Sequence, residues 1–397
     1  MNELLAQLRE WREAIDRRLP PWWSRALTVA LIVAGIVLPF LFAKTSGFTN
    51  ATIIALAYAV MAVGLNVVVG FAGLLDLGYV AFYAIGSYAM GWLGSTFFFK
   101  AHVHVLVHGI ANQEIGIHLN FLLILIAAAL ICAVAGVLIG LPTLRLRGDY
   151  IAIVTLAFGE IIGTVAVNGT DIHVGGGMTL TAGNIGISAP DQPYFPGIGQ
   201  FNGALNLRPF YWLILGILLL VVVINVRLRD SRLGRAWVAL REDEVAAVSM
   251  GIPLVRTKLL AYSIGAAFGG MSGAFFATYY TVINAGQFQF GFSILILAMV
   301  IVGGLGSIWG AVVGGLTLGY VNNYLIPNTF NSLPSKLGLH FQLTSVEFGI
   351  YGFLLVLVMV LRPQGLVPER RRKLEITGEI GAEDAQLVEP TATGPPL

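Results

Sequence analysis

The chain has 397 residues, of which 57% are hydrophobic and only 11% are charged. Soluble domains carry about 25% charged residues, so this composition, with its apolar runs of about 20 residues, excludes an ordinary soluble domain and predicts an all-α polytopic membrane protein. The net charge is only +2, so the placement of the charges matters more than their sum, and no nucleic-acid partner is expected.

Residues 1–25 are predicted to form an amphipathic helix that lies on the membrane surface and contacts lipid. Apolar side chains recur there at steps of three and four, and arginines occupy much of the opposite face. Trp22 and Trp23 are suited to anchor it in the headgroup layer. The segment carries acids and no small-residue cleavage site follows the first apolar run, so we do not expect a cleaved signal.

Residues 26–368 are predicted to be a transmembrane domain with about ten helices. The candidate spans lie at about 26–43, 51–70, 74–97, 121–141, 150–168, 211–228, 258–281, 290–304, 308–327 and 345–362. The runs at 74–97 and 290–304 could be broken or re-entrant, which is tolerated only where the backbone is buried in protein or lines a cavity. Cys132 lies in an apolar run and is expected to be a buried thiol. The acidic cytoplasmic tail, 369–397, is expected to be disordered.

The basic residues predict the orientation of these spans. If both termini are cytoplasmic, the inner segments hold 19 Lys and Arg residues and the outer segments hold four, which together account for all 23. The four outer residues are Lys44, Lys100, Arg208 and Lys336. Because cytoplasmic segments carry the excess of positive charge, both termini are expected on the cytoplasmic side.

Two long outer segments differ in kind from the spans. Residues 99–120 hold four histidines, His102, His104, His108 and His118. A metal site is one interpretation of their spacing, but no cysteine joins them, and surface histidines are the preferred interpretation. Residues 169–209 are rich in glycine, proline and asparagine, which predicts turns throughout. This segment is either a lid or docking surface, or a flexible connector.

Motifs for catalysis are missing from the sequence. The chain has no phosphate-binding loop, no zinc-protease or esterase motif and no cysteine pair. We therefore expect no catalytic residue, no cofactor and no metal in this chain.

Ionisable side chains inside spans are costly and indicate either function or helix pairing. Asp76, Tyr79 and Tyr83 follow at steps of three and four, so a helix would place them on one face with Gly86. That face could meet an ammonium group in a pathway, or Asp76 could be a helix N-terminal acid beside packed tyrosines. Glu160 lies mid-span with no cation on its own helix, so it must face a partner helix, water or a cavity.

Asn66, within another apolar run, is predicted to form a hydrogen bond between helices. The glycine series at 303–315 loosely resembles the turn around Gly70 and Gly73. Two such breaks would suit an internal repeat around a central pathway.

A charged island, residues 227–258, interrupts the apolar pattern. It carries seven of the 23 Lys and Arg residues and four of the 21 Asp and Glu residues, so it cannot lie in lipid. A short helix is predicted from Arg232 to about Met250, ended by Gly251 and Pro253. Its expected stripe is Leu233, Trp237, Leu240 and Glu244. The helix is either a lever that a cytoplasmic protein grips, or a solvated loop whose charge sets the topology.

Five motifs together resemble the M-type permease subunit of branched-chain amino-acid ABC importers. They are LLDLGYVAFYAIGSY (74–88), LRLRGDYIAIVTLAFGEII (144–162), LGRAWVALREDEVAAVSMGI (233–252), VIVGGLGSIWGAVVG (300–314) and LRPQGLVP (361–368). The resemblance runs from about residue 50 to 368. It implies a multi-pass protein of the bacterial inner membrane, similar in fold to the larger, vitamin B12-type importers.

The resemblance also implies partners and a substrate. The chain would pair with a dissimilar, H-type permease subunit, and two cytoplasmic ATPase subunits would bind the ATP. A periplasmic amino-acid-binding protein would deliver leucine, isoleucine or valine. The outer loop departs from the family, because a compact TGGPNGI-like turn is stretched here into HVGGGMTLTAGNIGI.

Residue roles follow from the same resemblance. The loop 229–257 would couple to the ATPases, and the candidate coupling residues are Arg235, Asp243, Glu244, Ala246, Ala247 and Gly251. Val245 stands where the family has a leading glutamate, and Glu244 comes one step earlier. The candidate residues of the translocation pathway come instead from the polar side chains inside the spans and are Asp76, Tyr79, Tyr83 and Glu160.

Three alternatives remain open. A permease for urea, short amides or other amino acids would look similar. An ion-coupled secondary transporter would use Asp76 and Glu160, although the spans lack Lys or Arg partners for them. A structural scaffold would leave the glycine-rich breaks and the buried acids without a role.

Overall fold

The computed structural model of the chain describes residues 33, 35–107, 114–143, 150–174, 176–329, 346–361 and 364–367. The predicted surface helix at 1–25 and the tail at 369–397 lie outside these residues, as do most of the first expected span and His108. The same holds for the basic residues Arg145 and Arg147.

Helices dominate the described chain. Within it, six segments are helical, apolar and long enough to cross a membrane: 47–71, 121–143, 150–168, 208–230, 254–280 and 285–303. The shorter apolar helices are 80–93 and 349–361. These helices confirm a polytopic membrane protein, while the count of ten spans and the position of both termini stay predictions.

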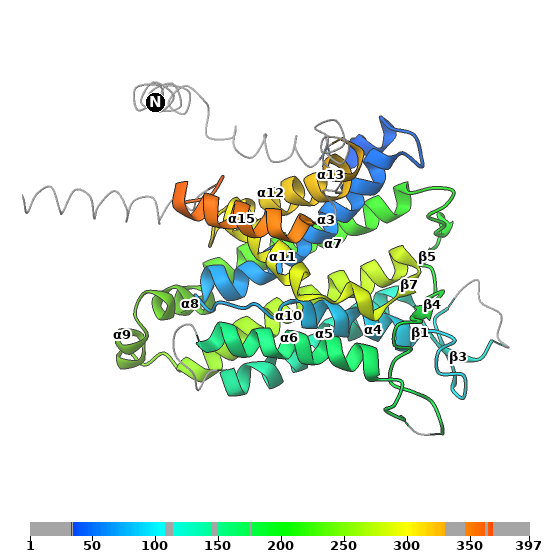
Figure 1. Cartoon of the computed structure of the whole chain (residues 1–397), viewed down its shortest axis with the longest axis horizontal. Helices are drawn as coiled ribbons and strands as arrows, with labels where there is room; N and C mark the ends of the chain where they lie inside the picture. Colours follow the sequence, from blue (N-terminus) through cyan, green and yellow to red (C-terminus); the bar gives the residue numbers. More distant parts are fainter. Residues whose placement is uncertain are drawn as a thin grey trace, which may run out of the picture.

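The helices form two groups that meet along α3 and α10 (Figure 1). One group holds α3 (Gly47–Asn66), α7 (Arg208–Asp230), α11 (Phe290–Gly303), α12 (Ile308–Tyr320) and α15 (Glu347–Leu361). The other holds α4 (Val80–Leu93), α5 (Phe121–Thr143), α6 (Tyr150–Asn168) and α10 (Leu254–Tyr280). Shorter pieces are η1 (Leu38–Phe40), η3 (Ala285–Gln287), η4 (Val321–Leu325) and α13 (Ile326–Asn328). Across the contact between the groups, the Ser272 hydroxyl on α10 donates to the Ala57 carbonyl on α3 at 3.0 Å.

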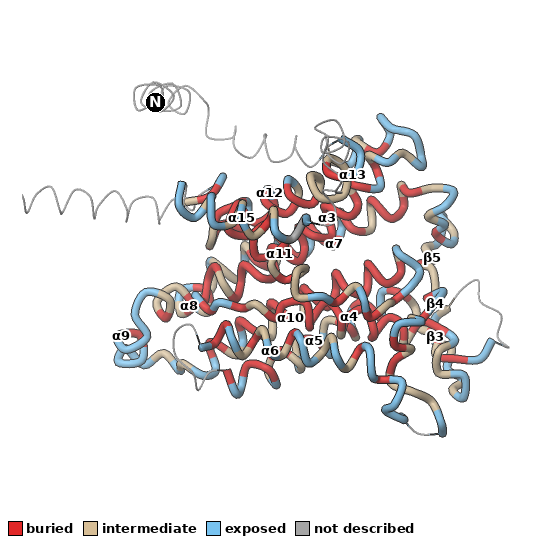
Figure 2. Tube along the Cα trace, viewed as in Figure 1, coloured by how far each residue is buried: buried red, intermediate tan, exposed pale blue. Residues whose placement is uncertain are grey.

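Small residues allow these helices to approach closely. A Cβ atom added to Gly86 on α4 would lie 2.2 Å from the Gly270 carbonyl oxygen on α10, so no side chain fits there. A Cβ on Gly315 of α12 would lie 2.6 Å from the Ala59 Cα on α3. Figure 2 shows the result as a continuous band of buried residues along α3, α10 and α4. Cys132 is buried and free, which confirms the expected core thiol.

Short strands correct the expectation of an all-α chain. β1 (Gly94–Ser95), β3 (Gly116–Leu119) and β2 (His102–Val105) form one sheet in that order, in which β3 runs antiparallel to β1 and parallel to β2. β4 (Ile187–Ser188) pairs antiparallel with β7 (Val282–Ile283), and β5 (Tyr194–Phe195) pairs antiparallel with β6 (Gly199–Gln200). These strands lie in the segments that link the helices, where extended residues from distant parts of the sequence satisfy one another's backbone groups.

The molecule therefore has two different ends (Figure 1). The strand end carries the short β-strands, and the platform end carries α8 (Arg232–Glu242) and α9 (Glu244–Ser249). All seven cations of the charged island belong to the platform end. The other cations in the described part of the chain, Lys44, Lys100 and Arg208, belong to the strand end. This distribution agrees with the charge asymmetry in the sequence.

The expected break near residue 74 is present. A π-helical turn, η2 (Val67–Phe71), ends the helix that begins with α3, and residues 72–79 then run without regular structure to α4. The predicted hydrogen bond of Asn66 is confirmed, because its Oδ1 accepts from the Gly306 N–H at 2.9 Å. A Cβ on Gly70 would lie 2.7 Å from the same Gly306 nitrogen. The two glycine-rich turns singled out in the sequence are thus in direct contact.

Candidate functional site

Helix α8 attaches the charged island to the bundle. Ser231 begins it as N-cap, since its Oγ accepts a hydrogen bond from the Gly234 N–H at 3.3 Å. Trp237 is fully buried, and its Nε1 donates to the Thr257 carbonyl oxygen on α10 at 2.8 Å. Leu240 is buried beside it. The stripe predicted from the sequence is therefore confirmed for Trp237 and Leu240.

The island forms two helices, so the single helix predicted from Arg232 to Met250 is wrong. Asp243 takes an extended conformation, with φ −150° and ψ 110°, and ends α8. Its Oδ1 then accepts hydrogen bonds from the N–H groups of Val245 and Ala246 at 2.8 and 2.9 Å, which makes Asp243 the N-cap of α9. When the Asp243 side chain bonds these N–H groups, it replaces the backbone bonds by which α8 would have continued. Glu244 consequently leaves the predicted stripe.

Two of the candidate coupling residues hold the island in shape. Glu244 forms an ion pair with Lys258 on α10, whose side chain is only 5% exposed against 48% for the glutamate. The Arg235 guanidinium donates to the Asp230 carbonyl oxygen at 3.0 Å. Both interactions lie within the chain: the Glu244 pair holds α9 against α10, and the Arg235 bond holds α8 against the end of α7.

Gly251 ends α9 in the left-handed region, with φ +86°, as expected for a C-terminal glycine. The N–H groups of Gly251 and Ile252 donate to the carbonyl oxygens of Val248 and Ala247 at 2.9 and 3.1 Å. Ala247 is buried, whereas Ala246 is exposed. The short helix therefore presents one face to the bundle and the other to solvent.

The solvent face of α9 is apolar, which the sequence reasoning missed. Val245 is 77% exposed and Met250 is 84% exposed, and Val248 lies exposed between them. Figure 2 shows α9 as an exposed tip of the molecule. The signal that could have revealed this face was the apolar pair at a step of three, Val245 and Val248, in a segment too charged to be core. A group of large apolar side chains held in water by capped helices is typical of a protein interaction surface.

The predicted face of Asp76, Tyr79, Tyr83 and Gly86 does not exist as a helical face. Asp76 lies in the irregular stretch before α4, because its carboxylate accepts the Gly78 N–H at 2.8 Å and so stabilises a turn in place of a helix. Asp76, Tyr79 and Tyr83 are only 2%, 0% and 3% exposed.

The two tyrosines are packed against protein. The Tyr79 hydroxyl donates to the Gly265 carbonyl oxygen on α10 at 2.9 Å. The Tyr83 ring stacks on Phe292 at 4.9 Å between ring centroids. In this conformation, neither side chain opens onto a pathway.

Glu160 has the opposite environment and lies exposed on α6. The exposed residues of α6 follow a stripe at steps of three and four, with Ile161 and Asn168 beside it: Tyr150, Ile153, Ala157, Glu160, Thr164 and Val167. By contrast, the exposed residues of α5 include Leu122, Ile126, Leu130, Val134 and Leu138, and those of α15 include Phe353, Val356 and Val360. A purely apolar stripe suits lipid, but a carboxylate and a hydroxyl at mid-span do not. The α6 stripe is therefore suited to face protein or water.

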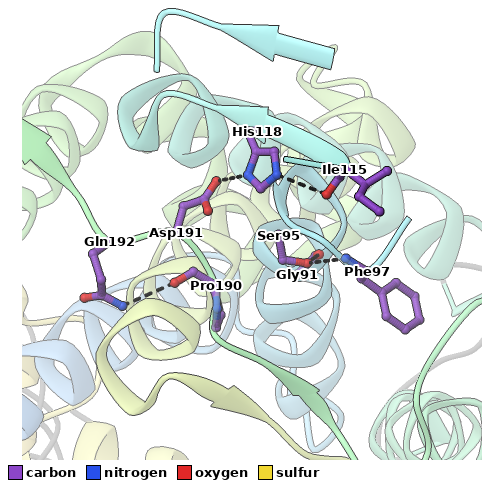
Figure 3. A network of polar contacts seen from close by, with 8 residues as sticks. All are labelled: Gly91, Ser95, Phe97, Ile115, His118, Pro190, Asp191 and Gln192. Atoms are coloured by element: carbon purple, nitrogen blue, oxygen red, sulfur yellow. Dashed lines mark hydrogen bonds and ion pairs between the residues drawn. The ribbon is translucent and has the colours of Figure 1, made fainter. Parts of the chain in front are cut away.

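The strand end is held by a polar network that the sequence reasoning also missed (Figure 3). His118 on β3 is 1% exposed, and its Nδ1 lies 2.8 Å from the Asp191 Oδ2. The surface interpretation is therefore wrong for His118. The backbone N–H of Asp191 donates to the Gly94 carbonyl oxygen at 2.7 Å, and Gln192 Nε2 donates to the Thr278 carbonyl oxygen at 3.2 Å. These contacts fasten the long outer segment to β1, β3 and α10.

His104 packs on this network, with its ring stacked on that of His118 at 5.0 Å between centroids. His102 is exposed. Among the described residues, no group of three or more His, Cys, Asp or Glu side chains is placed to hold a metal ion. Burial raises the pKa of the Asp191 carboxyl, and the hydrogen bond and charge of His118 lower it in part.

Comparisons with known proteins give the family to which these features belong. Residues 47–359 match the family described as branched-chain amino acid transport system, permease component. The chain is 36% identical over 383 residues to the high-affinity branched-chain amino acid transport system permease protein LivM of Salmonella typhimurium. The match covers 91% of this chain and 79% of that protein.

Two more distant relatives carry similar names. The probable branched-chain amino acid transport permease protein LivM of Methanocaldococcus jannaschii is 26% identical over 348 residues, which is 81% of this chain and 96% of that protein. The high-affinity permease protein LivH of Salmonella typhimurium is 25% identical over 324 residues, which is 80% of this chain and 93% of that protein. No solved structure matches the chain.

Proposed function

The chain belongs to the family of permease components of branched-chain amino acid transport systems, and we propose that it forms one half of an ATP-driven import pathway for leucine, isoleucine and valine. Its relatives are permease proteins, so the chain is a transport component and not an enzyme. The other half of the pathway would be a second, H-type permease subunit, for which the similarity to LivH gives the precedent.

Energy would enter through the platform end. Two cytoplasmic ATPase subunits bind the ATP in this proposal, and this chain binds no cofactor. The observation that carries the proposal is the exposed apolar face of α9, Val245, Val248 and Met250, on a helix fixed at both ends by Asp243 and Gly251. A rigid helix with such a face can seat in a groove of another protein and transmit its movement.

Substrate would pass along α6. The exposed stripe of α6 would face the second permease subunit across the pathway, and the Glu160 carboxylate would attract the ammonium group of an amino acid. Apolar neighbours such as Ile153 suit the branched side chain of the substrate. Asp76, Tyr79 and Tyr83 are buried, so in this proposal they take part by moving with the break at 72–79.

The proposal places the chain in the bacterial inner membrane with both termini in the cytoplasm and about ten spans, as in the vitamin B12-type importers. The seven cations of the platform end, against three at the strand end in the described residues, support this orientation. A periplasmic amino-acid-binding protein would then dock at the strand end, where the outer segment 169–209 is fastened by the Asp191 network.

Reconstitution tests the proposal. The chain, the second permease and both ATPases are placed in liposomes, and uptake of labelled leucine is measured with the binding protein on one side and ATP on the other. We expect uptake that requires ATP, both permeases and the binding protein. Uptake by the complex without ATP would contradict the claim that ATP hydrolysis drives transport.

The same preparation separates the alternatives. An ion-coupled transporter that uses Asp76 and Glu160 would take up leucine without ATPases and lose uptake with an uncoupler alone. A permease for urea or short amides would give ATP-dependent uptake of those compounds, with no competition by leucine, isoleucine or valine.

A further inference from the structure

Arg241 reaches from the charged island into the membrane bundle. Its Nη1 donates a hydrogen bond to the Gly70 carbonyl oxygen in η2 at 2.6 Å. Its side chain also lies against the backbone of Gly73, where an added Cβ would be 2.7 Å from the Arg241 Cγ. By contrast, the guanidinium groups of Arg229 and Arg235 donate hydrogen bonds to Asp230 within the island. The Arg241 side chain therefore bridges α8 and the break that follows α3.

The break that Arg241 contacts also packs against the glycine-rich turn between α11 and α12. Gly70, whose carbonyl accepts the guanidinium bond, lies so close to Gly306 that no Cβ fits between them. Asn66 bonds the same Gly306 N–H from the preceding turn of α3. A charge-assisted bond to this carbonyl thus restrains the point where α3 meets the turn between α11 and α12.

The end of the break that is farther along the chain, at Leu77 and Gly78, packs against α6, the helix with the exposed stripe. The Leu77 N–H donates to the Thr155 Oγ1 at 3.0 Å. A Cβ on Gly78 would lie 1.9 Å from the Thr155 carbonyl oxygen, so the two backbones are in contact. Gly159, the neighbour of Glu160 in the chain, packs against Gly78 as well. The segment 67–79 is therefore continuous from Arg241 at one side to the helix of Glu160 at the other.

We propose that Arg241 is a positioning residue that transmits movement of the platform through the segment 67–79 to α6. The segment, a π-helical turn followed by irregular backbone, can shift as a unit because it is held at one side by a guanidinium bond and at the other by contacts with α6. The inference rests on the proposed function, since it assumes that the ATPases move α8 and α9. Arg241 itself touches neither ATP nor substrate.

The test compares Arg241→Gln, Arg241→Lys and the control Arg227→Gln in the complete reconstituted complex. Arg227 is an exposed arginine at the end of α7, outside the loop 229–257. The readout is leucine taken up per ATP hydrolysed, at matched amounts of assembled complex. We expect the ratio to fall by about tenfold in Arg241→Gln, the factor expected for one lost bond to a charged group. Arg241→Lys keeps the charge but has a shorter side chain, so its ratio should lie between those of Arg241→Gln and the wild type. The ratio for Arg227→Gln should equal that of the wild type.

Other outcomes overturn the inference in distinct ways. If hydrolysis and uptake fall in the same proportion in Arg241→Gln, the residue has a structural role only. If Arg241→Gln does not assemble, Arg241→Lys decides, and a normal ratio in that variant contradicts the proposal. Failure of the proposed function is recognised separately, because the wild-type complex itself would then show no ATP-dependent uptake.

Discussion

At the scale of single residues, Glu160 carries the strongest energetic constraint on α6. A charged side chain at the centre of a spanning helix costs about 2.5–3.5 kcal/mol when it faces lipid. The carboxylate is nevertheless exposed on the stripe of α6, with Thr164 one turn away and Ile153 two turns away. A protein or water-filled environment removes most of this cost, and in the proposed function that environment is the pathway.

Replacement of Glu160 tests that role. In Glu160→Gln the side chain keeps its size and loses its charge, so attraction for an ammonium group is lost. We expect leucine uptake by the reconstituted complex to fall by about tenfold, a loss of ~1.4 kcal/mol, with assembly of the complex unchanged. Ile162→Leu, on the side of the same helix that packs against the core, should leave uptake unchanged. Uptake by Glu160→Gln at the wild-type rate would contradict a pathway role, and reduced assembly would indicate a pairing role.

Asp191 links the stability of the strand end to pH. Burial raises the pKa of its carboxyl above the usual 3.8, against the opposing effects of His118. The folded chain therefore keeps this proton at pH values at which the unfolded chain has lost it, so stability falls as the pH rises from about 3.9 through the raised folded pKa.

Thermal unfolding of the detergent-solubilised chain measures this effect. Carboxyl groups in proteins titrate within the range of about pH 4 to 7. As the pH rises through this range, the Tm of the wild-type chain should include a decrease that the Tm of Asp191→Asn does not show. Asp171→Asn, at an exposed aspartate of the same outer segment, should keep the component. Equal slopes in wild type and Asp191→Asn would show that the raised pKa is absent.

At the scale of elements, the contrast between α5 and α6 assigns their surroundings. Both helices expose residues at steps of three and four, but the α5 stripe is apolar throughout and the α6 stripe contains Glu160 and Thr164. Lipid is the appropriate environment for the first and an aqueous or protein surface for the second. The two helices are in contact, so the proposed function puts the boundary between lipid and pathway between them.

Single cysteines can map this boundary. Ile153→Cys and Thr164→Cys on α6 should react with a polar thiol reagent, or cross-link to the second permease, at least about tenfold faster than Ile126→Cys and Leu130→Cys on α5, because the thiolate forms only where water is available. The native Cys132 is buried, which keeps the background low. Equal reactivity on both helices would contradict the assignment of α6.

The island shows what a linear pattern predicts for an element and what it leaves out. The pattern predicted the start at Arg232, the stripe that contains Trp237 and the end at Gly251, because an apolar stripe and a C-terminal glycine are local signals. It did not predict the break at Asp243. An aspartate can sit inside a helix or cap a new one, and here the ion pair of Glu244 with Lys258 on α10 accompanies the second choice.

At the scale of the whole molecule, the membrane class and most helix positions could be predicted, because apolar runs and charge placement are encoded along the chain. The contacts at the strand end could not, since His118 and Asp191 are 73 residues apart. The face expected for Asp76 and Tyr79 failed for a related reason. A turn formed by Asp76 with Gly78 and a bond from Tyr79 to Gly265 on α10 replace the first turn of a helix.

In the proposed function, the whole molecule is a bundle with an input at the platform end and a pathway wall at α6, joined by the segment 67–79. The platform depends on α9, and α9 depends on Gly251, whose φ of +86° suits glycine or asparagine but not a β-branched residue. An added Cβ meets nothing within 4 Å there, so a substitution acts through the backbone and not through a clash.

Uptake and ATP hydrolysis by the reconstituted complex with Gly251→Val, measured beside Gly251→Asn, test the central claim most directly. Valine costs about 1–2 kcal/mol in the left-handed region and should distort the end of α9. We expect Gly251→Val to assemble and hydrolyse ATP while leucine uptake falls by about tenfold or more, and Gly251→Asn to take up leucine close to the wild-type rate. Wild-type uptake by Gly251→Val would contradict the claim that energy enters through this platform.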